Sequence, residues 1–108
     1  KFLVLFLDCS HRLIALETMA EGTIDHAPVY AREVLRRAVE LSASGLILVH
    51  NHPSGSETIS KADVNVTTQI ARAAAALDIA LIDHLVVAGQ TVLGFVERGL
   101  LPLSSGRC

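Results

Sequence analysis

Two histidines stand one residue apart directly after an apolar segment. The segment GLILV occupies residues 45–49, and His50, Asn51 and His52 follow it. Successive side chains of a β-strand point to opposite faces of the sheet, so His50 and His52 would lie on the same face. Pro53 then ends the strand, because proline has no backbone N–H to donate. We therefore expect two imidazoles at one strand end, where they could bind a single metal ion.

A carboxylate that could join the two imidazoles is Asp63. Residues 54–59 are predicted to form a polar loop and a helix is predicted to begin at Ser60, so a residue of its first turn can point back at the strand end. Two imidazoles and one carboxylate are suitable zinc ligands, and three protein ligands leave a fourth position for water. Zinc lowers the pKa of a bound water molecule to about 7. This pattern predicts a hydrolytic zinc site.

The same residues also have structural interpretations. Ser60 followed three residues later by Asp63 fits a capping box, in which the serine side chain and the acid bond backbone N–H groups at a helix start. An isolated pair of histidines on a strand is more commonly explained by hydrogen bonding within the protein or by exposure to water. The capping and ligand roles are compatible, because the cap would orient the turn that carries Asp63.

The elements that would position these residues follow from the spacing of apolar side chains. This spacing predicts strands at 2–8, 13–24, 46–49, 80–89 and 91–99, and helices at 60–77 and from Pro28 or Ala31 to Ala43. The short connection between the first two strands predicts antiparallel pairing, with Gly22 as a candidate bulge. In the first helix the predicted core stripe consists of Val34, Leu35, Ala38, Val39 and Leu41.

This order of elements, β-β-α-β-α-β-β, predicts an α/β fold with a mixed β-sheet and helices packed on its faces. No internal repeat and no linker composition interrupts the sequence. We therefore expect residues 1–108 to form a single domain. The strand at Phe2 and the terminal hairpin are the candidate sheet edges for self-association.

Composition narrows the function classes. The formal net charge is -2, which argues against nucleic-acid binding by this domain alone. The cluster Arg32, Arg36 and Arg37 reads as the solvated face of a helix. No apolar run approaches the ~20 residues of a membrane span, and no signal peptide is visible. Cys9 and Cys108 are expected to be free thiols in a reducing compartment, which favours the cytoplasm.

With these motifs in place, a family resemblance can be stated. H-x-H-P followed by S-x-x-D resembles the JAMM (MPN+) metalloprotease motif, and VLFLD, RLIALE, GTIDHAPVYAREVLRRAVEL, LILVHNHPSG, DHLVV and GFVERGLL resemble the RadC family in that order, from Phe2 to Leu101. The resemblance implies a cytidine-deaminase-like (JAB/MPN) α/β sandwich. It also implies a zinc-dependent hydrolase that cleaves an amide or isopeptide bond of a peptide or protein. His50, His52 and Asp63 would then bind zinc, and Ser60 would hydrogen-bond the oxyanion or the activated water.

One residue of the family pattern has no match here. JAMM enzymes use a glutamate at the start of the first core strand as general acid and base. Because that strand begins at Lys1 and Phe2, we expect the glutamate to precede Lys1 and the chain to be a piece of a longer protein. The internal alternatives, Glu17, Glu21 and Glu33, are expected to be surface residues.

Two alternatives stay open at this point. The domain could be a non-catalytic binding module in DNA repair or mobile-element biology, although a scaffold need not keep the full ligand set. Asp83 and His84 open the fourth predicted strand and could reach the same site. For these two we expect a hydrogen-bonded pair at a strand end.

Overall fold

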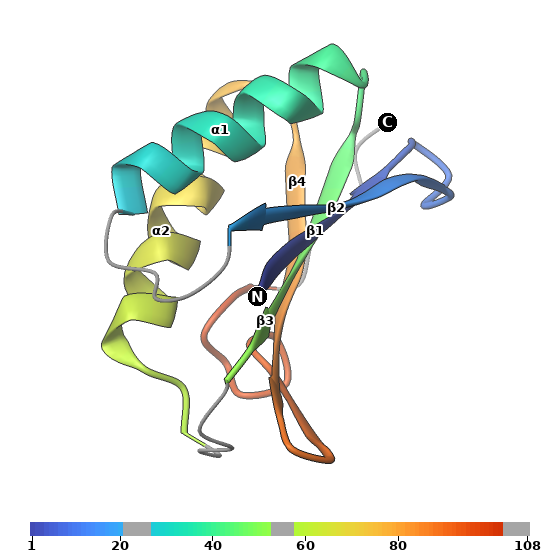
Figure 1. Cartoon of the computed structure of the whole chain (residues 1–108). Coiled ribbons are helices and arrows are strands. Elements are labelled where there is room, and N and C mark those ends of the chain that lie inside the picture. Colours follow the sequence, from blue (N-terminus) through green and yellow to red (C-terminus); the bar gives the residue numbers. More distant parts are fainter. Residues whose placement is uncertain (21–26, 53–57, 103–108) are drawn as a thin grey trace.

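The structure is a computed structural model that describes residues 1–20, 27–52 and 58–102. Within these ranges the elements are the strands β1 (Phe2–Leu7), β2 (Leu13–Ala20), β3 (Gly45–Asn51), β4 (Ala80–Ala88) and β5 (Thr91–Gly94) and the helices α1 (Ala27–Glu40) and α2 (Lys61–Ala76) (Figure 1). Their order confirms the β-β-α-β-α-β-β prediction. The candidate bulge at Gly22 lies outside the described residues.

The strands form one mixed sheet in the order β2-β1-β3-β4-β5. β3 pairs parallel with β4, and the other neighbouring strands pair antiparallel, as predicted for β1 and β2. β3, which leads into the two histidines, is therefore the central strand. Leu46 and Leu48 on its helix-covered face are fully buried, whereas Ile47 and Val49 on the opposite face are half-buried. The terminal hairpin forms one edge of the sheet, as expected, because β5 is an outermost strand. The strand at Phe2 is not an edge, because β1 lies between β2 and β3.

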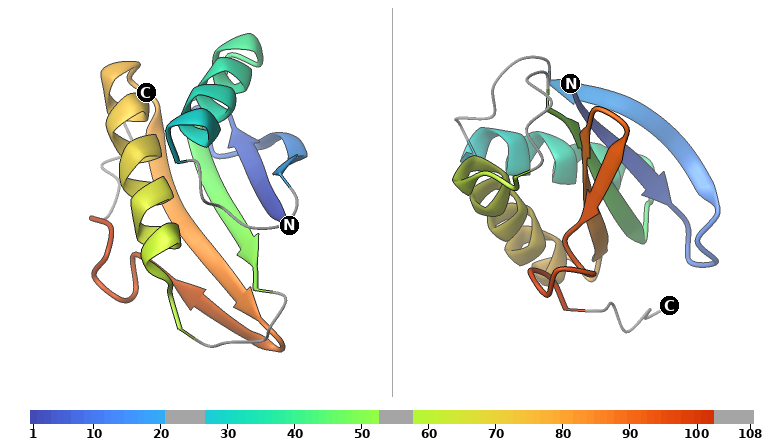
Figure 2. Two further views of the ribbon diagram at one scale, coloured as in Figure 1. Left: turned by 60° about the vertical axis from the view of Figure 1, so that its left-hand side comes forward. Right: turned by 90° about the horizontal axis from the view of Figure 1, so that it is seen from below.

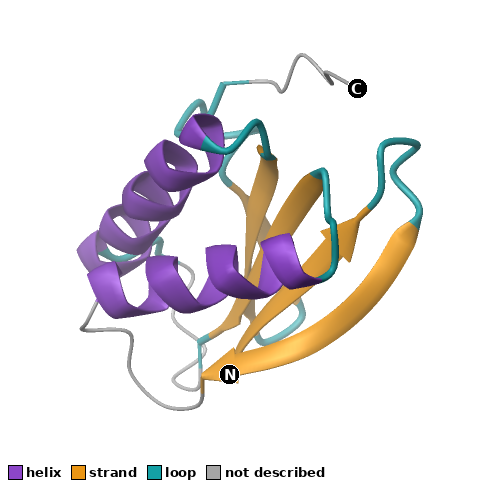
Figure 3. Cartoon of the chain, turned by 90° about the horizontal axis from the view of Figure 1, so that it is seen from above, coloured by secondary structure: helices purple, strands orange, loops and turns teal. Residues whose placement is uncertain are grey.

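Both helices cover the same face of the sheet (Figures 2 and 3). The apolar side chains of this face and those of the helices form one core, which is the α/β arrangement expected from the sequence. Its fully or almost fully buried members include Phe2, Val4, Phe6, Val34, Leu35, Ala38, Leu46, Leu48, Val66, Ile70 and Ala74.

The first helix departs from its prediction in two respects. It ends at Glu40 rather than Ala43, because Ser42 has a left-handed backbone (φ 54°) that a helix cannot accommodate. Val39 is also 58% exposed, so its assignment to the core stripe is wrong. On a helical wheel Val39 lies roughly a quarter turn from the centre of the stripe formed by Val34, Leu35 and Ala38, which carries it past the edge of the sheet.

A register shift interrupts the pairing of β4 with β3. Leu46 pairs with Leu81 but Ile47 pairs with Asp83, so Ile82 is an extra residue in β4. An extra residue resets the alternation of side chains. As a result, His84 faces the helix-covered side of the sheet, as Leu81 does, and both are buried.

The carboxylate of Asp83 holds the chain at this shift. Its Oδ1 accepts hydrogen bonds from the backbone N–H of His84 at 2.7 Å and of Val96 at 3.1 Å. The second bond ties β4 to the turn that follows β5. The backbone that carries His84 is therefore fixed from two directions.

Two further findings bear on the sequence expectations. Cys9 is disulfide-bonded, so the expectation of a free thiol there is wrong, and Cys108 lies outside the described residues. None of the described helices is both long enough and apolar enough to cross a membrane.

Candidate metal centre

The start of α2 fixes the position of Asp63. Ser60 is the N-cap residue, and its Oγ accepts a hydrogen bond from the Asp63 backbone N–H at 3.1 Å. In return the Asp63 carboxylate accepts the Ser60 backbone N–H at 3.1 Å. This reciprocal capping box confirms the predicted helix start. It places the carboxylate in the first turn, facing the end of β3.

The Asp63 carboxylate contacts both predicted histidines. Its Oδ1 lies 2.5 Å from Nδ1 of His50, and its Oδ2 lies 2.8 Å from Nε2 of His52. The hydroxyl of Ser60 donates to the same Oδ2 at 2.8 Å. The two imidazole rings are 4.9 Å apart and nearly perpendicular. The structure therefore brings the predicted residues His50, His52, Ser60 and Asp63 together at one point.

Asp63 is fully buried and yet ionised. Burial alone would raise the pKa of its carboxyl group, because water no longer solvates the charge. The hydrogen bonds from His50, from Ser60 and from His52 outweigh this effect and hold the pKa well below its usual value. A negative charge is thus maintained on a buried side chain beside two imidazoles, which favours a bound cation.

A third imidazole, that of His84, lies at the same place. His50, Asp63 and His84 are all buried, and each offers one ligand atom within 4.8 Å of the others. His84 is fully buried, in the interior of β4 rather than at its beginning. Its Nδ1 is hydrogen-bonded to Oγ1 of Thr67, on α2. The expectation of a pair at a strand end is therefore wrong for His84, because Asp83 bonds its backbone and not its ring.

Aromatic side chains enclose this third ring. Phe95 stacks on His84 with the centroids 4.6 Å apart and the planes 18° from parallel. The Phe2 ring is in an edge-to-face arrangement with two imidazole rings. Its centroid lies 6.2 Å from that of His84 and 6.4 Å from that of His50. Burial lowers the pKa of His84 to about 4, so the ring is neutral at physiological pH and can offer a nitrogen lone pair.

Comparison with known proteins identifies this architecture. The family model described as "RadC-like JAB domain" matches residues 1–100. The chain belongs to the RadC-like JAB domain family. This finding confirms the resemblance stated from the sequence.

Curated relatives of this RadC-like domain are similar over nearly all of the chain. The protein named "UPF0758 protein" from Rhodobacter capsulatus is 57% identical over 101 residues, which are 94% of this chain and 47% of the relative. A "UPF0758 protein" from Leptothrix cholodnii is 51% identical over 93% of this chain and 45% of its own length. "UPF0758 protein SPO0054" from Ruegeria pomeroyi is 50% identical over 94% of this chain and 45% of its own length. The chain spans about half the length of these relatives.

The side chains of the RadC-like domain fit a divalent metal ion. Imidazole nitrogens and a carboxylate oxygen are the donors that zinc and other first-row transition metals bind. Nε2 of His84 is a fully buried polar atom that has no hydrogen-bond partner among the described residues. A buried lone pair without a donor is unfavourable, and a cation at this point would satisfy it.

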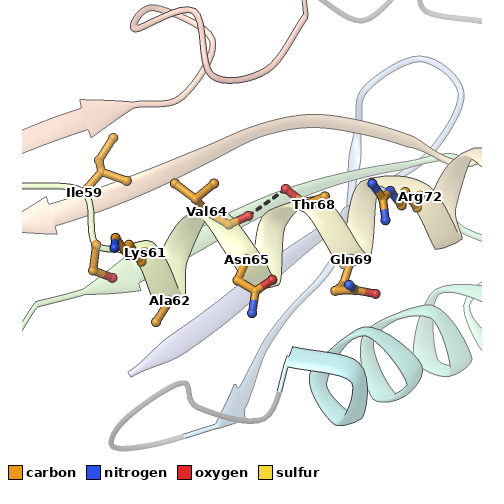
Figure 4. A pocket seen from close by; sticks show the side chains of 9 residues that line it. Ile59, Lys61, Ala62, Val64, Asn65, Thr68, Gln69 and Arg72 are labelled. Carbon is orange, nitrogen blue, oxygen red and sulfur yellow. Dashed lines mark hydrogen bonds between the residues drawn. The ribbon is translucent and has the colours of Figure 1, made fainter.

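A shallow groove on the RadC-like domain shares a residue with this centre. It runs along the exposed side of α2 from Ile59 and Ser60 to Arg72, past polar side chains that include Asn65 and Gln69 (Figure 4). Ser60 is exposed here while its hydroxyl contacts the buried Asp63. An extended chain lying in the groove would therefore reach the centre through Ser60.

The internal glutamates named as alternative bases are engaged elsewhere. Both carboxylate oxygens of Glu17 accept hydrogen bonds from Arg37, at 2.8 Å in the shortest contacts, which ties β2 to α1. Glu33 pairs with Arg36 at 3.0 Å on the surface of α1. Glu21 lies outside the described residues. Glu17 and Glu33 are therefore structural surface residues, as the sequence analysis expected.

Proposed function

We propose that this RadC-like JAB domain is a zinc-dependent metallohydrolase that cleaves an amide or isopeptide bond in a peptide or protein. The observation that carries the proposal is the buried Asp63 carboxylate held between His50 and His52. In this proposal His50, His52 and Asp63 bind the zinc ion. When bound, zinc would polarise the scissile carbonyl and activate a water molecule.

Ser60 has the position needed to stabilise developing negative charge. Its side chain is exposed to solvent, and its hydroxyl lies 2.8 Å from the proposed ligand Asp63. A hydroxyl beside the ligands can donate to an oxyanion that forms at the substrate carbonyl. In this structure the hydroxyl proton is donated to Asp63 Oδ2, and it would have to turn from that oxygen toward the oxyanion when substrate binds.

The general base is proposed to be a glutamate that precedes Lys1 in the longer protein. The backbone N–H of Asn51 donates to the carbonyl of Lys1 at 3.0 Å, so the start of β1 runs beside the end of β3. Chain preceding Lys1 would continue along this edge toward His52. A carboxylate there could carry a proton from the activated water to the leaving amine.

The groove along α2 is the proposed approach for the substrate. It is lined by both apolar and polar side chains, and at Ser60 it meets the buried charge of Asp63. A peptide segment in the groove could place a carbonyl group beside Ser60. Localisation in the cytoplasm stays a prediction from the sequence, although the disulfide bond of Cys9 removes the free-thiol argument for it.

The first test is zinc uptake by the chain of 108 residues. Elemental analysis and calorimetric titration of the chelator-treated protein should give one zinc ion per chain, and His50→Ala should lose it. The matched control is His11→Asn, at an exposed turn position with φ 62°, where asparagine fits the left-handed backbone. No uptake by the unsubstituted chain, or equal uptake by His50→Ala, would contradict the proposal.

The second test is hydrolysis by a chain extended upstream of Lys1. Cleavage of an isopeptide-linked or peptide substrate should stop with chelator and return with zinc. Cleavage that is insensitive to chelator would exclude the metal mechanism. Zinc binding without cleavage of any peptide or isopeptide substrate would instead support the alternative, a metal-stabilised binding module.

A further inference from the structure

We propose that His84 is a further ligand of the same cation and binds it through Nε2. The inference rests on the proposed metal centre and adds a residue outside the H-x-H and S-x-x-D pattern. The centre would then consist of three imidazoles and one carboxylate.

The two ring nitrogens of His84 are in different states. Thr67 donates its hydroxyl proton to the backbone carbonyl of Asp63 at 2.6 Å. A threonine hydroxyl has only one proton, so its contact with His84 must be one in which Nδ1–H donates to Oγ1. A neutral imidazole carries one N–H, and with Nδ1 protonated, Nε2 keeps its lone pair. The hydrogen bond to Thr67 therefore selects the tautomer that can bind a metal through Nε2.

The lone pair on Nε2 of His84 is buried without a partner among the described residues. His84 is fully buried, and its Nε2 has no hydrogen-bond partner among the residues that the structure describes. The other ring nitrogen is bonded to Thr67. A buried acceptor left in this state costs about 1–3 kcal/mol, so the position is stable only if the surrounding fold enforces it.

The surrounding fold holds the His84 ring in this position. The register shift at Ile82 turns His84 toward the helix-covered face. Phe95 stacks on the ring, and Phe2 contacts it from the edge. The carboxylate of Asp83 fixes the backbone from the other side of the strand. The ring is thus held rigidly beside the centre, as metal ligands usually are.

The two oxygens of the Asp63 carboxylate differ in the contacts that they make. Oδ2 receives hydrogen bonds from His52 and from both the backbone and the side chain of Ser60. For Oδ1 the described contact is the one with His50. Oδ1 is therefore the less engaged oxygen of Asp63, a residue whose ligand atom lies within 4.8 Å of those of His50 and His84. A cation bound there would meet Nε2 of His84. Zinc can expand to five ligands, so this does not exclude water.

Nitrogen-15 NMR of the histidine-labelled chain tests the proposal directly. The spectrum is recorded before and after one equivalent of zinc, and the His84 signals are assigned from a His84→Gln variant. We expect the Nε2 resonance of His84 to move from the position of an unprotonated nitrogen to that of a metal-bound one. If the His50 signals move and those of His84 do not, this inference fails while the proposed function stands. If no histidine signal moves, both fail.

Zinc affinity provides a second readout. His84→Gln, which keeps an amide donor for Thr67, should weaken zinc binding about 100-fold or more, and Thr67→Val should weaken it about 10–100-fold by releasing the ring. The control is Thr68→Val, on the same helix but with its hydroxyl bonded to the backbone carbonyl of Val64 at 2.9 Å. Circular dichroism confirms folding of each variant. Unchanged affinity in a folded His84→Gln would overturn the proposal.

Discussion

Ser60 and Asp63 hold each other in place with three hydrogen bonds, two of them to the same carboxylate oxygen. One carboxylate therefore caps helix α2 and also joins the two histidines of β3. Binding at the centre and order at the start of the helix must be coupled, since both depend on the position of Asp63. Substitution of the capping residue Ser60 therefore tests directly whether the helix start holds Asp63 in place.

Replacement of Ser60 by alanine should destabilise the metal-free chain by about 1 kcal/mol, because it removes the side-chain cap of α2. Urea denaturation measures this loss. Ser60→Thr, which keeps the hydroxyl, is the control and should lose less. An alanine variant as stable as the original chain would show that the cap is not formed in solution.

The burial of neutral His84 predicts a pH dependence of stability. Its pKa is lowered from 6.5 to about 4 in the folded chain, chiefly by burial. The unfolded chain therefore takes up a proton below about 6.5 when the folded chain does not. The resulting stability is fully present above about pH 6.5 and is lost as the pH falls toward 4, with a magnitude on the order of 3 kcal/mol.

Urea denaturation with chelator present, at pH values across this interval, checks the dependence on His84. The comparison is with His84→Gln, which retains the titration of every other group. Subtraction of the two curves isolates the contribution of His84. Parallel curves would mean that the ring is not buried in its neutral form.

The carboxylate of Asp83, which lies at the register shift, should be needed to hold His84 in its position. Asp83→Ala removes the acceptor for the backbone N–H groups of His84 and Val96, which should cost about 1–3 kcal/mol of unfolding free energy. Asp83→Asn keeps an oxygen acceptor and should lose less. The positional readout is the nitrogen-15 shift of the His84 ring, which should move in the alanine variant. An unmoved ring signal would show that packing by Phe95 suffices.

Two valines of α1 provide a matched test of the core. Val34 is fully buried and Val39 is 58% exposed. Val34→Ala should cost about 2 kcal/mol, because it removes buried apolar surface and leaves a cavity. Val39→Ala should stay within about 0.5 kcal/mol of the original chain. Equal losses in urea denaturation would contradict the observed orientation of the helix.

Much of the fold could be predicted because its signals are local. The apolar run before His50 predicts a strand, and Ser60 with Asp63 predicts a helix start, since both patterns depend on neighbours a few residues apart. The convergence of His50, His52 and Asp63 follows from the same two elements. The family resemblance pointed to the same residues.

His84 was misjudged because its role depends on a non-local feature. Regular alternation counted from Leu81 would place Asp83 toward the helices and His84 on the opposite face. The extra residue Ile82 reverses this assignment, and only the pairing with β3 reveals it. The engagement of Glu17 with Arg37, from different elements, is likewise beyond any local pattern.

Thr67 lies one helical turn after Asp63, and it contacts the carbonyl of Asp63 on one side and the ring of His84 on the other. A single turn of α2 is consequently the spacer that sets how far the carboxylate stands from the innermost imidazole. A residue inserted between these two positions would change the distance between the carboxylate and the imidazole while leaving both groups chemically intact.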